Sequence, residues 1–239
     1  RKNKVRAATA AQAKAREKKL MKMDKIEINK QKPKPHFNFK FSKPSWSVIL
    51  KTKNLVIGYD KALTKPLDLK MSKNEKIAII GANGIGKTTL LKSLMKIINP
   101  IEGKVMLDEQ HLDIGYYEQE NYYTDNVVIN EISNEFPKNT KTEVRRMLAR
   151  CGLTNEHINS KLCELSGGEQ AKVRLCKVIN KPSNILFLDE PTNHLDVDAK
   201  DELKRALINY EGSVVLVSHD RDFYKDIVTK VWNCENWKV

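Results

Sequence analysis

The spacing of apolar positions changes near residue 46 of this chain. Beyond that point, short apolar runs between turn residues predict strands. The continuously apolar run Ile77–Ile80 precedes a glycine-rich turn and a helical pattern over 88–98, which is typical of a central strand in a covered parallel sheet. The other predicted strands are 47–50, 55–57, 67–71, 185–188 and 214–217. The pattern indicates an α/β domain, which we place at residues 41–239.

Helical spacing replaces the strand pattern in the middle of this domain. The clearest helices are predicted at Glu143–Cys151 and Glu169–Asn180, within a polar stretch at about 126–180. A further helix is predicted at Asp198–Asn209, between the last two strands. We therefore expect a helical insertion between the early and the late strands.

The first 40 residues predict a separate structure. A segment over 5–29 is rich in strong helix formers and lacks Pro and Gly, so we expect a helix there. Its apolar stripe is too thin to join a core, whereas it could pair with one other helix. Pro33 and Pro35 cannot continue a helix and favour extended chain. We assign residues 1–40 to a helical linker arm and a proline-containing connection.

The net charge also differs between residues 1–40 and the rest of the chain. The chain has 239 residues and a net charge of +13, and residues 1–40 hold 14 Lys or Arg against three acids. The remaining residues are almost neutral. A basic arm on a near-neutral body suggests a polyanionic partner, although a merely solvated helix is the alternative.

Composition excludes several classes of protein. Hydrophobic residues make up 40% of the chain, which is enough for a core and excludes disorder of the whole. No apolar run approaches the roughly 20 residues of a membrane span, and no signal peptide is recognisable. Four cysteines without a CxxC pair indicate reduced thiols, so we expect a cytoplasmic location. Because the chain begins at Arg1, we expect it to be a piece of a longer protein.

The most specific motif is Gly81-Ala-Asn-Gly84-Ile-Gly86-Lys87-Thr88, which matches GxxxxGK[ST] between a predicted strand and a predicted helix. Its glycines allow successive N–H groups to point into one concavity, and the helix adds its positive end. Lys87 would reach the β- and γ-phosphates of a nucleotide, and the Thr88 hydroxyl would ligate Mg²⁺. The alternative is a flexible glycine turn.

A second candidate is the apolar strand 185–188, which ends in Asp189 and Glu190. These carboxylates would lie at the carboxyl edge of the sheet, where ligands of such sheets bind. Asp189 would hold Mg²⁺ through water, and Glu190 would act as general base on the attacking water. Many strands end in acids, so the pair alone is a weak signal. Together with the phosphate loop upstream it indicates a nucleotide site.

A third candidate is Leu165-Ser166-Gly167-Gly168-Glu169-Gln170, which opens a helix and offers a hydroxyl and free N–H groups to an anion. Taken alone, it is better explained as an N-cap followed by a turn. Gln119 and His219, taken singly, read as plain polar residues, and Tyr59 as the end of a strand.

These motifs stand in one order along the chain, and with Asp196 they resemble the motif set of the ATP-binding cassette (ABC) family over residues 46–239. The resemblance implies a P-loop NTPase cassette with a mixed sheet core, an antiparallel β subdomain and a helical signature subdomain. It also implies that two cassettes pair head to tail around ATP and Mg²⁺. A single chain has half of each site and needs a second copy of itself, as a homodimer, or a second cassette.

The resemblance assigns roles residue by residue. Adenine would stack on Tyr59, catalysis would fall to Glu190 and His219, and the metal would be held by Thr88, Gln119 and Asp189. The remaining nucleotide contacts would be Gly81, Asn83, Gly84, Gly86, Lys87, Thr88, Thr89 and Gln119, with Ser166, Gly167 and Gly168 serving the opposite nucleotide.

The stretches 190–199 and 218–223 resemble the ABC-F subfamily, which consists of soluble tandem-cassette ATPases, many of which act on the ribosome. The basic helix resembles the returning half of their linker, although the first cassette is missing here. The resemblance implies an ATPase whose closing and opening control ribosome binding, with the arm against ribosomal RNA. A translation factor and an antibiotic-resistance factor remain open, and the alternative is the ATPase subunit of a membrane transporter. A DNA-repair ATPase of the structural-maintenance type is a third alternative. It would need a long coiled coil inserted in the cassette, which the uninterrupted run 81–219 lacks.

Overall fold

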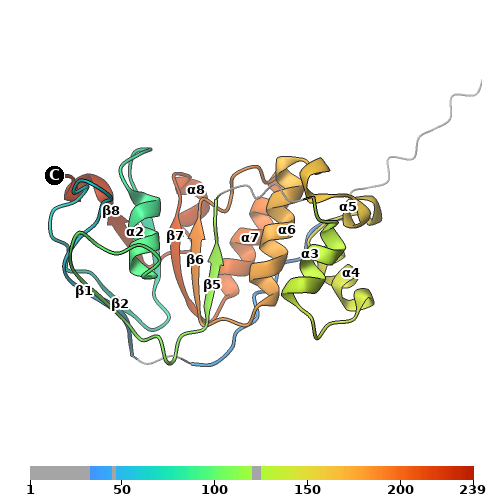
Figure 1. Ribbon diagram of the computed structural model, residues 1–239, viewed down its shortest axis with the longest axis horizontal. Helices are drawn as coiled ribbons and strands as arrows, with labels where there is room; N and C mark the ends of the chain where they lie inside the picture. Colours follow the sequence, from blue (N-terminus) through green and yellow to red (C-terminus); the bar gives the residue numbers. More distant parts are fainter. Residues whose placement is uncertain (1–32, 45–46, 120–124) are drawn as a thin grey trace, which may run out of the picture. The chain divides into compact units, whose positions relative to one another are not determined.

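The computed structural model describes residues 33–44, 47–119 and 125–239, and Pro33–Val239 forms one compact unit (Figure 1). The basic helix predicted for residues 5–29 lies outside the described residues.

A parallel sheet of five strands in the order β5-β6-β7-β3-β8 forms the centre of this unit. Strands β6 and β7 are buried throughout, because helices and a second sheet cover their two faces. Alternate side chains of β6 therefore enter two different cores, with Leu186 and Leu188 in one and Ile185 and Phe187 in the other. The strands are β3 (Lys76–Ile80), β5 (Ile114–Tyr117), β6 (Ile185–Asp189), β7 (Ser213–Val217) and β8 (Lys230–Asn233).

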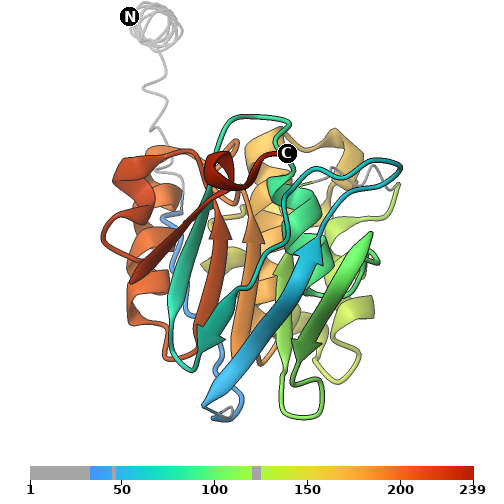
Figure 2. The ribbon, with the colours of Figure 1, turned by 90° about the vertical axis from the view of Figure 1, so that its left-hand side faces the viewer.

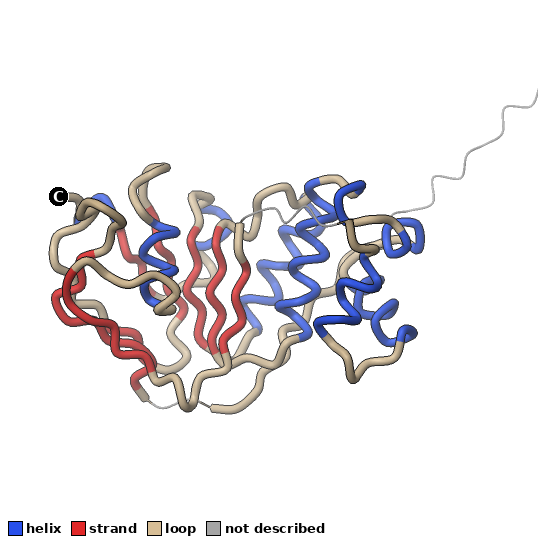
Figure 3. The backbone as a smooth tube through the Cα atoms, viewed as in Figure 1, coloured by secondary structure: helices blue, strands red, loops and turns tan. Residues whose placement is uncertain are grey.

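A smaller antiparallel sheet in the order β2-β1-β4 covers one side, with helix α2 (Lys87–Leu94) between the two sheets (Figures 1 and 3). Its strands are β1 (Val48–Val56), β2 (Lys70–Ser72) and β4 (Glu102–Leu107). The inner face of this sheet is apolar and shares its core with α2 and with one face of the parallel sheet.

Helices cover the opposite face and form the far end of the unit (Figure 3). Residues 128–180, between β5 and β6, are mostly helical, and the apolar stripes of these helices share one core with α7. The helices are α3 (Val128–Glu135), α4 (Lys141–Arg150), α5 (Asn155–Asn159), η1 (Leu162–Glu164), α6 (Gly167–Asn180), α7 (Val197–Asn209), α8 (Arg221–Tyr224) and η2 (Cys234–Trp237). No helix among the described residues is long and apolar enough to cross a membrane.

Some predicted elements differ from the structure. The strands predicted at 47–50 and 55–57 are one strand, β1, whose register shifts between Lys53 and Val56. The helix predicted over 88–98 ends at Leu94, because Lys96 adopts a left-handed conformation with φ 59°. Strands β4, β5 and β8 were not predicted, because they are short and lack a clean apolar alternation.

The segment after Pro33 takes part in the core. Phe37 and Phe39 are buried, as alternate side chains of an extended segment. The Phe37 N–H donates to Oε1 of Glu202 at 2.8 Å, and Nη2 of Arg205 donates to the Phe37 carbonyl at 2.8 Å. The sequence assigned residues up to 40 to the arm, whereas the compact unit begins at Pro33.

Candidate functional site

The loop between β3 and α2 holds the glycine-rich motif. Gly81, Gly84 and Gly86 have φ values of 146°, 78° and 100°, a region that favours glycine. The loop curls around the Lys87 side chain, whose Nζ donates to the carbonyls of Gly81 at 3.0 Å and Ala82 at 3.1 Å. A buried ammonium group inside a turn of backbone amides is a ready site for an anion.

Two carboxylates stand at the end of β6, next to this loop. Asp189 is fully buried, and neither carboxylate oxygen has a hydrogen-bond partner in the described part of the chain. Burial raises the pKa of Asp189, and the nearby Thr88 hydroxyl lowers it only in part. Glu190 follows with φ 47°, a left-handed conformation that is rare outside glycine. Strain of this kind often accompanies functional sites.

Glu190 is paired with His219, which follows β7. Nδ1 of His219 lies 2.9 Å from Oε2 of Glu190. The Glu190 side chain is only 7% exposed, whereas that of His219 is 61% exposed, so the imidazole links a buried carboxylate to solvent. The pair forms because β6 and β7 are adjacent parallel strands whose carboxyl ends meet at one edge of the sheet.

A pocket of about 480 Å³ lies over the phosphate loop and these carboxylates. Most of the residues predicted from the sequence line it, including Tyr59 at its edge, which is 66% exposed, and Gln119 after β5. The residue before Gln119 is fixed to α2, since Lys92 lies 2.7 Å from Glu118. The lining is Tyr59, Leu63, Asn83, Gly84, Gly86, Lys87, Thr88, Thr89, Gln119, Asp189, Glu190, Asn193, Val217 and His219.

Three lining residues were missed from the sequence. Leu63 and Val217 carry no chemical signal, since Leu63 is an apolar residue of a loop and Val217 belongs to a buried strand. Asn193 lies within the stretch 190–196 that was singled out, but no role was assigned to it. A fourth residue, Glu235, anchors the loop from outside the pocket by accepting the Ala82 N–H through Oε1 at 2.7 Å.

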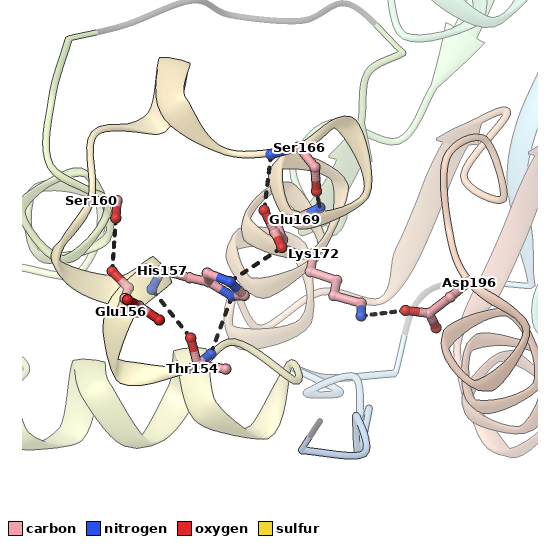
Figure 4. Close-up of polar contacts among 8 residues, drawn as sticks. All are labelled: Thr154, Glu156, His157, Ser160, Ser166, Glu169, Lys172 and Asp196. Carbon is pink, nitrogen blue, oxygen red and sulfur yellow. Dashed lines mark hydrogen bonds and ion pairs between the residues drawn. The ribbon is translucent and has the colours of Figure 1, made fainter. Parts of the chain in front are cut away.

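The serine–glycine motif lies elsewhere, at the start of α6, and does not line this pocket. Ser166 and Glu169 form a reciprocal cap, in which the Ser166 N–H donates to Oε2 of Glu169 at 2.9 Å (Figure 4). Nε2 of His157 in turn lies 3.2 Å from Oε1 of Glu169. The cap is therefore held from α5 as well as from α6.

The same motif contacts the loop that follows Glu190. A Cβ atom on Gly168 would lie 2.7 Å from the His194 carbonyl oxygen, so only glycine fits this close approach. One turn further along α6, Nζ of Lys172 donates to Oδ2 of Asp196 at 2.6 Å (Figure 4). Asp196 also caps α7 by accepting the Ala199 N–H at 2.8 Å. The serine–glycine motif is thus packed against the loop that follows Glu190.

The comparisons with known proteins agree with this geometry. A family model described as "ABC transporter" matches residues 64–193, which is more than half of the chain. An uncharacterized ABC transporter ATP-binding protein of Bacillus subtilis, YfmM, is 58% identical over 83% of this chain. The ABC transporter F family member 2 of Arabidopsis thaliana is 41% identical over 77%. The chain spans 38% and 28% of the length of these two relatives.

Solved structures confirm the predicted fold class. An ABC transporter ATP-binding protein of Pyrococcus furiosus, described as putative in its title, matches with a TM-score of 0.65 and 23% identity over 80% of this chain and 99% of that chain. The cassette MJ0796, in a dimeric post-hydrolysis state with ADP and Pi, matches with a TM-score of 0.65 and 23% identity over 77% and 94%. At this identity the likeness establishes the fold alone.

The phosphate loop, the carboxylates of β6 and the signature motif thus occur together on a cassette fold, and the chain belongs to the ABC transporter family as an ATP-binding ABC ATPase cassette whose relatives include members of the F family.

Proposed function

We propose that this cassette works as one half of an ATP-driven pair in a cytoplasmic ABC-F protein that binds the ribosome. The observation that carries the proposal is the separation of two half-sites on one chain. The phosphate loop, Glu190 and His219 share one pocket, whereas Ser166, at the start of α6, does not line it.

ATP would enter the pocket with its phosphates against the loop 81–89. Lys87 would exchange its two carbonyl contacts for oxygens of the β- and γ-phosphates, which a charged acceptor makes favourable. Adenine would stack on the exposed ring of Tyr59 at the edge of the pocket.

The site fits Mg²⁺ because the two buried oxygens of Asp189 make no well-formed hydrogen bond among the described residues, and the Thr88 hydroxyl is the nearby donor. Thr88 and Gln119 would hold the ion directly and Asp189 through water, and the ion would supply charge neutralisation at the β- and γ-phosphates.

Glu190 would act on the water that attacks the γ-phosphorus. As the new P–O bond forms, Glu190 takes the proton of the water and the bond to the ADP oxygen breaks. His219 would hold Glu190 in place through the 2.9 Å contact, and it lines the same pocket with its exposed side chain. The buried position of Glu190 keeps its carboxylate from turning towards solvent.

A second cassette would complete both sites. Ser166, Gly167 and Gly168 would donate to the nucleotide held by that cassette, while its own signature would close over the pocket of this chain. Two observations support ribosome binding, namely the F-family relatives and the excess of Lys and Arg in residues 1–40. Basic side chains on an arm would supply phosphate contacts with ribosomal RNA. A housekeeping translation factor and a factor that protects ribosomes from antibiotics both fit this proposal.

The experiment is Glu190→Gln in the full-length protein that carries this chain. We expect ATP binding to persist, hydrolysis to fall by about 10²- to 10⁴-fold because the general base is lost, and the closed pair to accumulate on ribosomes. Ribosome pelleting with and without ATP measures this.

The matched control is the double variant Lys87→Ala/Glu190→Gln, which should lose both ATP binding and enrichment. Equal pelleting of Glu190→Gln with and without ATP would contradict the proposal.

A further inference from the structure

The outer face of the antiparallel sheet carries lysines directly opposite one another. The register places Lys51 of β1 against Lys70 of β2, and Lys53 of β1 against Lys104 of β4. Figure 2 views this sheet from its outer side, with the blue strand β1 in front. All four side chains are exposed, and we call this set the lysine face.

The lysines are fixed on this side by the packing of the other side. Leu50, Leu55 and Met71 are buried against the core that includes α2, so the sheet cannot turn its outer face inward. A slip of one residue in register would expose these apolar side chains instead. The lysine face is therefore a consequence of the fold and not of loop conformation.

The four ammonium groups are unneutralised. No ion pair involves any of them in the part of the chain that the structure describes. Like charges directly opposite across an antiparallel pair are destabilising. The repulsion between these ammonium groups therefore lowers the stability of the isolated protein. A bound anionic partner would relieve this repulsion.

Two exposed acids beside the lysine face lower its net charge, but neither forms an ion pair with its lysines in the described ranges. Glu102 shares the outer face of β4 with Lys104, and Oδ1 of Asp68 accepts the Asn54 N–H at 2.8 Å. A further amine lies at the edge of the sheet, where Nζ of Lys230 donates to the Lys70 carbonyl at 3.2 Å. Between β1 and β4 the surface is hollowed into a shallow depression of about 510 Å³, lined by Lys53, Asn54, Glu102, Gly103 and Lys104.

We propose that the lysine face binds the phosphate backbone of folded RNA, which in the function proposed above, on which this inference rests, is ribosomal RNA. Lysines two residues apart on a strand are spaced by about 6.6 Å, so the face is a regular array of point charges. Duplex nucleic acid carries about one charge per 1.7 Å of its axis, which is dense enough to give every ammonium group a phosphate.

The composition of the face favours RNA over an acidic protein. Protein–protein interfaces are depleted in Lys and enriched in aromatic residues and Arg. The outer positions of these strands hold lysines without an aromatic residue or an arginine, and their apolar members are Met106 and Val48, which are 40% and 38% exposed. Lysine binds phosphate as a point charge and reads no sequence, so the contact would be independent of base identity.

The test is a titration of this chain with a labelled RNA hairpin at salt concentrations between about 50 and 200 mM. The variant carries Lys51→Gln, Lys53→Gln, Lys70→Gln and Lys104→Gln. We expect weaker binding and a slope of log K against log salt that is shallower by about 2 to 4, since each phosphate contact contributes about 0.9. The matched control carries the same change at four exposed lysines outside both the lysine face and residues 1–40, which are Lys138, Lys141, Lys161 and Lys181.

Several results would contradict the assignment of RNA binding to the lysine face. An equal loss of slope in both variants would show a net-charge effect and overturn the assignment, as would failure of the wild-type chain to bind the hairpin. Binding to anionic phospholipid vesicles but not to RNA would also overturn it. Misfolding is checked by thermal unfolding, where removal of like-charge pairs should leave Tm unchanged or higher. If RNA binding behaves as expected but Glu190→Gln does not enrich on ribosomes, the ribosomal function fails and the lysine face stands.

Discussion

Asp189 shows how a single residue can be placed for function at the expense of stability. Its carboxylate is buried at the end of β6, and burial raises its pKa. A buried carboxylate without donors is unfavourable to the folded state. In the proposed function, Mg²⁺ bound with the nucleotide would supply the partner that this carboxylate lacks.

We therefore predict that Asp189→Asn stabilises the chain in the absence of nucleotide. At acidic pH, below the usual pKa of aspartate, the carboxyl is protonated in the folded and unfolded chain, and the variant and wild type differ least. As the pH rises from the usual pKa of aspartate to the raised pKa, the unfolded chain loses this proton before the folded chain does, so the wild type loses stability relative to the variant, and above the raised pKa the difference is constant. We expect the difference in Tm to grow to about 2–4 °C, which corresponds to about 1 kcal/mol.

Thermal unfolding at several pH values measures this difference, and Asp222→Asn is the control. The Lys225 ammonium group lowers the pKa of Asp222, so that carboxylate favours folding as the pH rises and its removal should not stabilise. Addition of Mg²⁺ and ATP should stabilise the wild type more than Asp189→Asn. A Tm difference that shrinks towards neutral pH would contradict the argument.

Among the helices, α6 shows that an element can be fixed at its start by contacts that the helical sequence pattern does not predict. The Ser166–Glu169 cap can be predicted from the sequence, because the residues stand at the spacing of a capping box. The approach of Gly168 to the His194 carbonyl cannot, since it depends on where the loop 190–196 turns. This contact ties the signature motif to the strand end that carries Glu190.

Gly168→Ala should separate these two roles of glycine. The new Cβ would meet the His194 carbonyl at 2.7 Å, so the backbone must shift, and we expect a loss of about 1–3 kcal/mol in the free energy of unfolding. Gly167→Ala is the control, because its Cβ first meets the exposed His194 ring at 3.4 Å. Urea unfolding should show Gly167→Ala close to wild type. Equal losses would mean that helix geometry, and not the loop contact, requires glycine.

The helices α4, α6 and α7 were predicted to within a few residues, because each has a long apolar stripe that only one helical face can bury. Strand β4 was not, since only Val105 among its six residues is buried. Its existence depends on pairing with β1, a contact between segments far apart in sequence.

At the scale of the whole molecule, we propose that the cassette begins near Pro33. Removal of residues 1–32 should leave the urea unfolding of the remaining unit unchanged. Removal of residues 1–40 should destabilise it by about 3–5 kcal/mol or more, because the buried Phe37 and Phe39 side chains are then lost. Equal stability of the two truncated chains would contradict a core role for this segment.

In the proposed function, each nucleotide site is shared between two cassettes. Ser166 is exposed and lies outside the pocket, so Ser166→Arg should leave ATP affinity of this chain unchanged. In the full-length protein the same change should reduce ATP hydrolysis by roughly half or more, because one of the two sites loses an anion contact. Lys87→Ala is the control that loses ATP binding in the chain itself. Loss of ATP affinity in Ser166→Arg would argue against a site shared between cassettes.

The amino-acid sequence indicated the candidate chemistry of this protein without a structure, because the phosphate loop and the strand that ends in two carboxylates are local patterns, each recognised within a few neighbouring residues. It also determined the long amphipathic helices and the buried central strands. Tertiary structure decided the pairing of Glu190 with His219, the shortage of donors around Asp189 and the alignment of lysines across β2, β1 and β4. These features depend on strand order and register, which join residues distant in the chain and are set by the burial of whole faces.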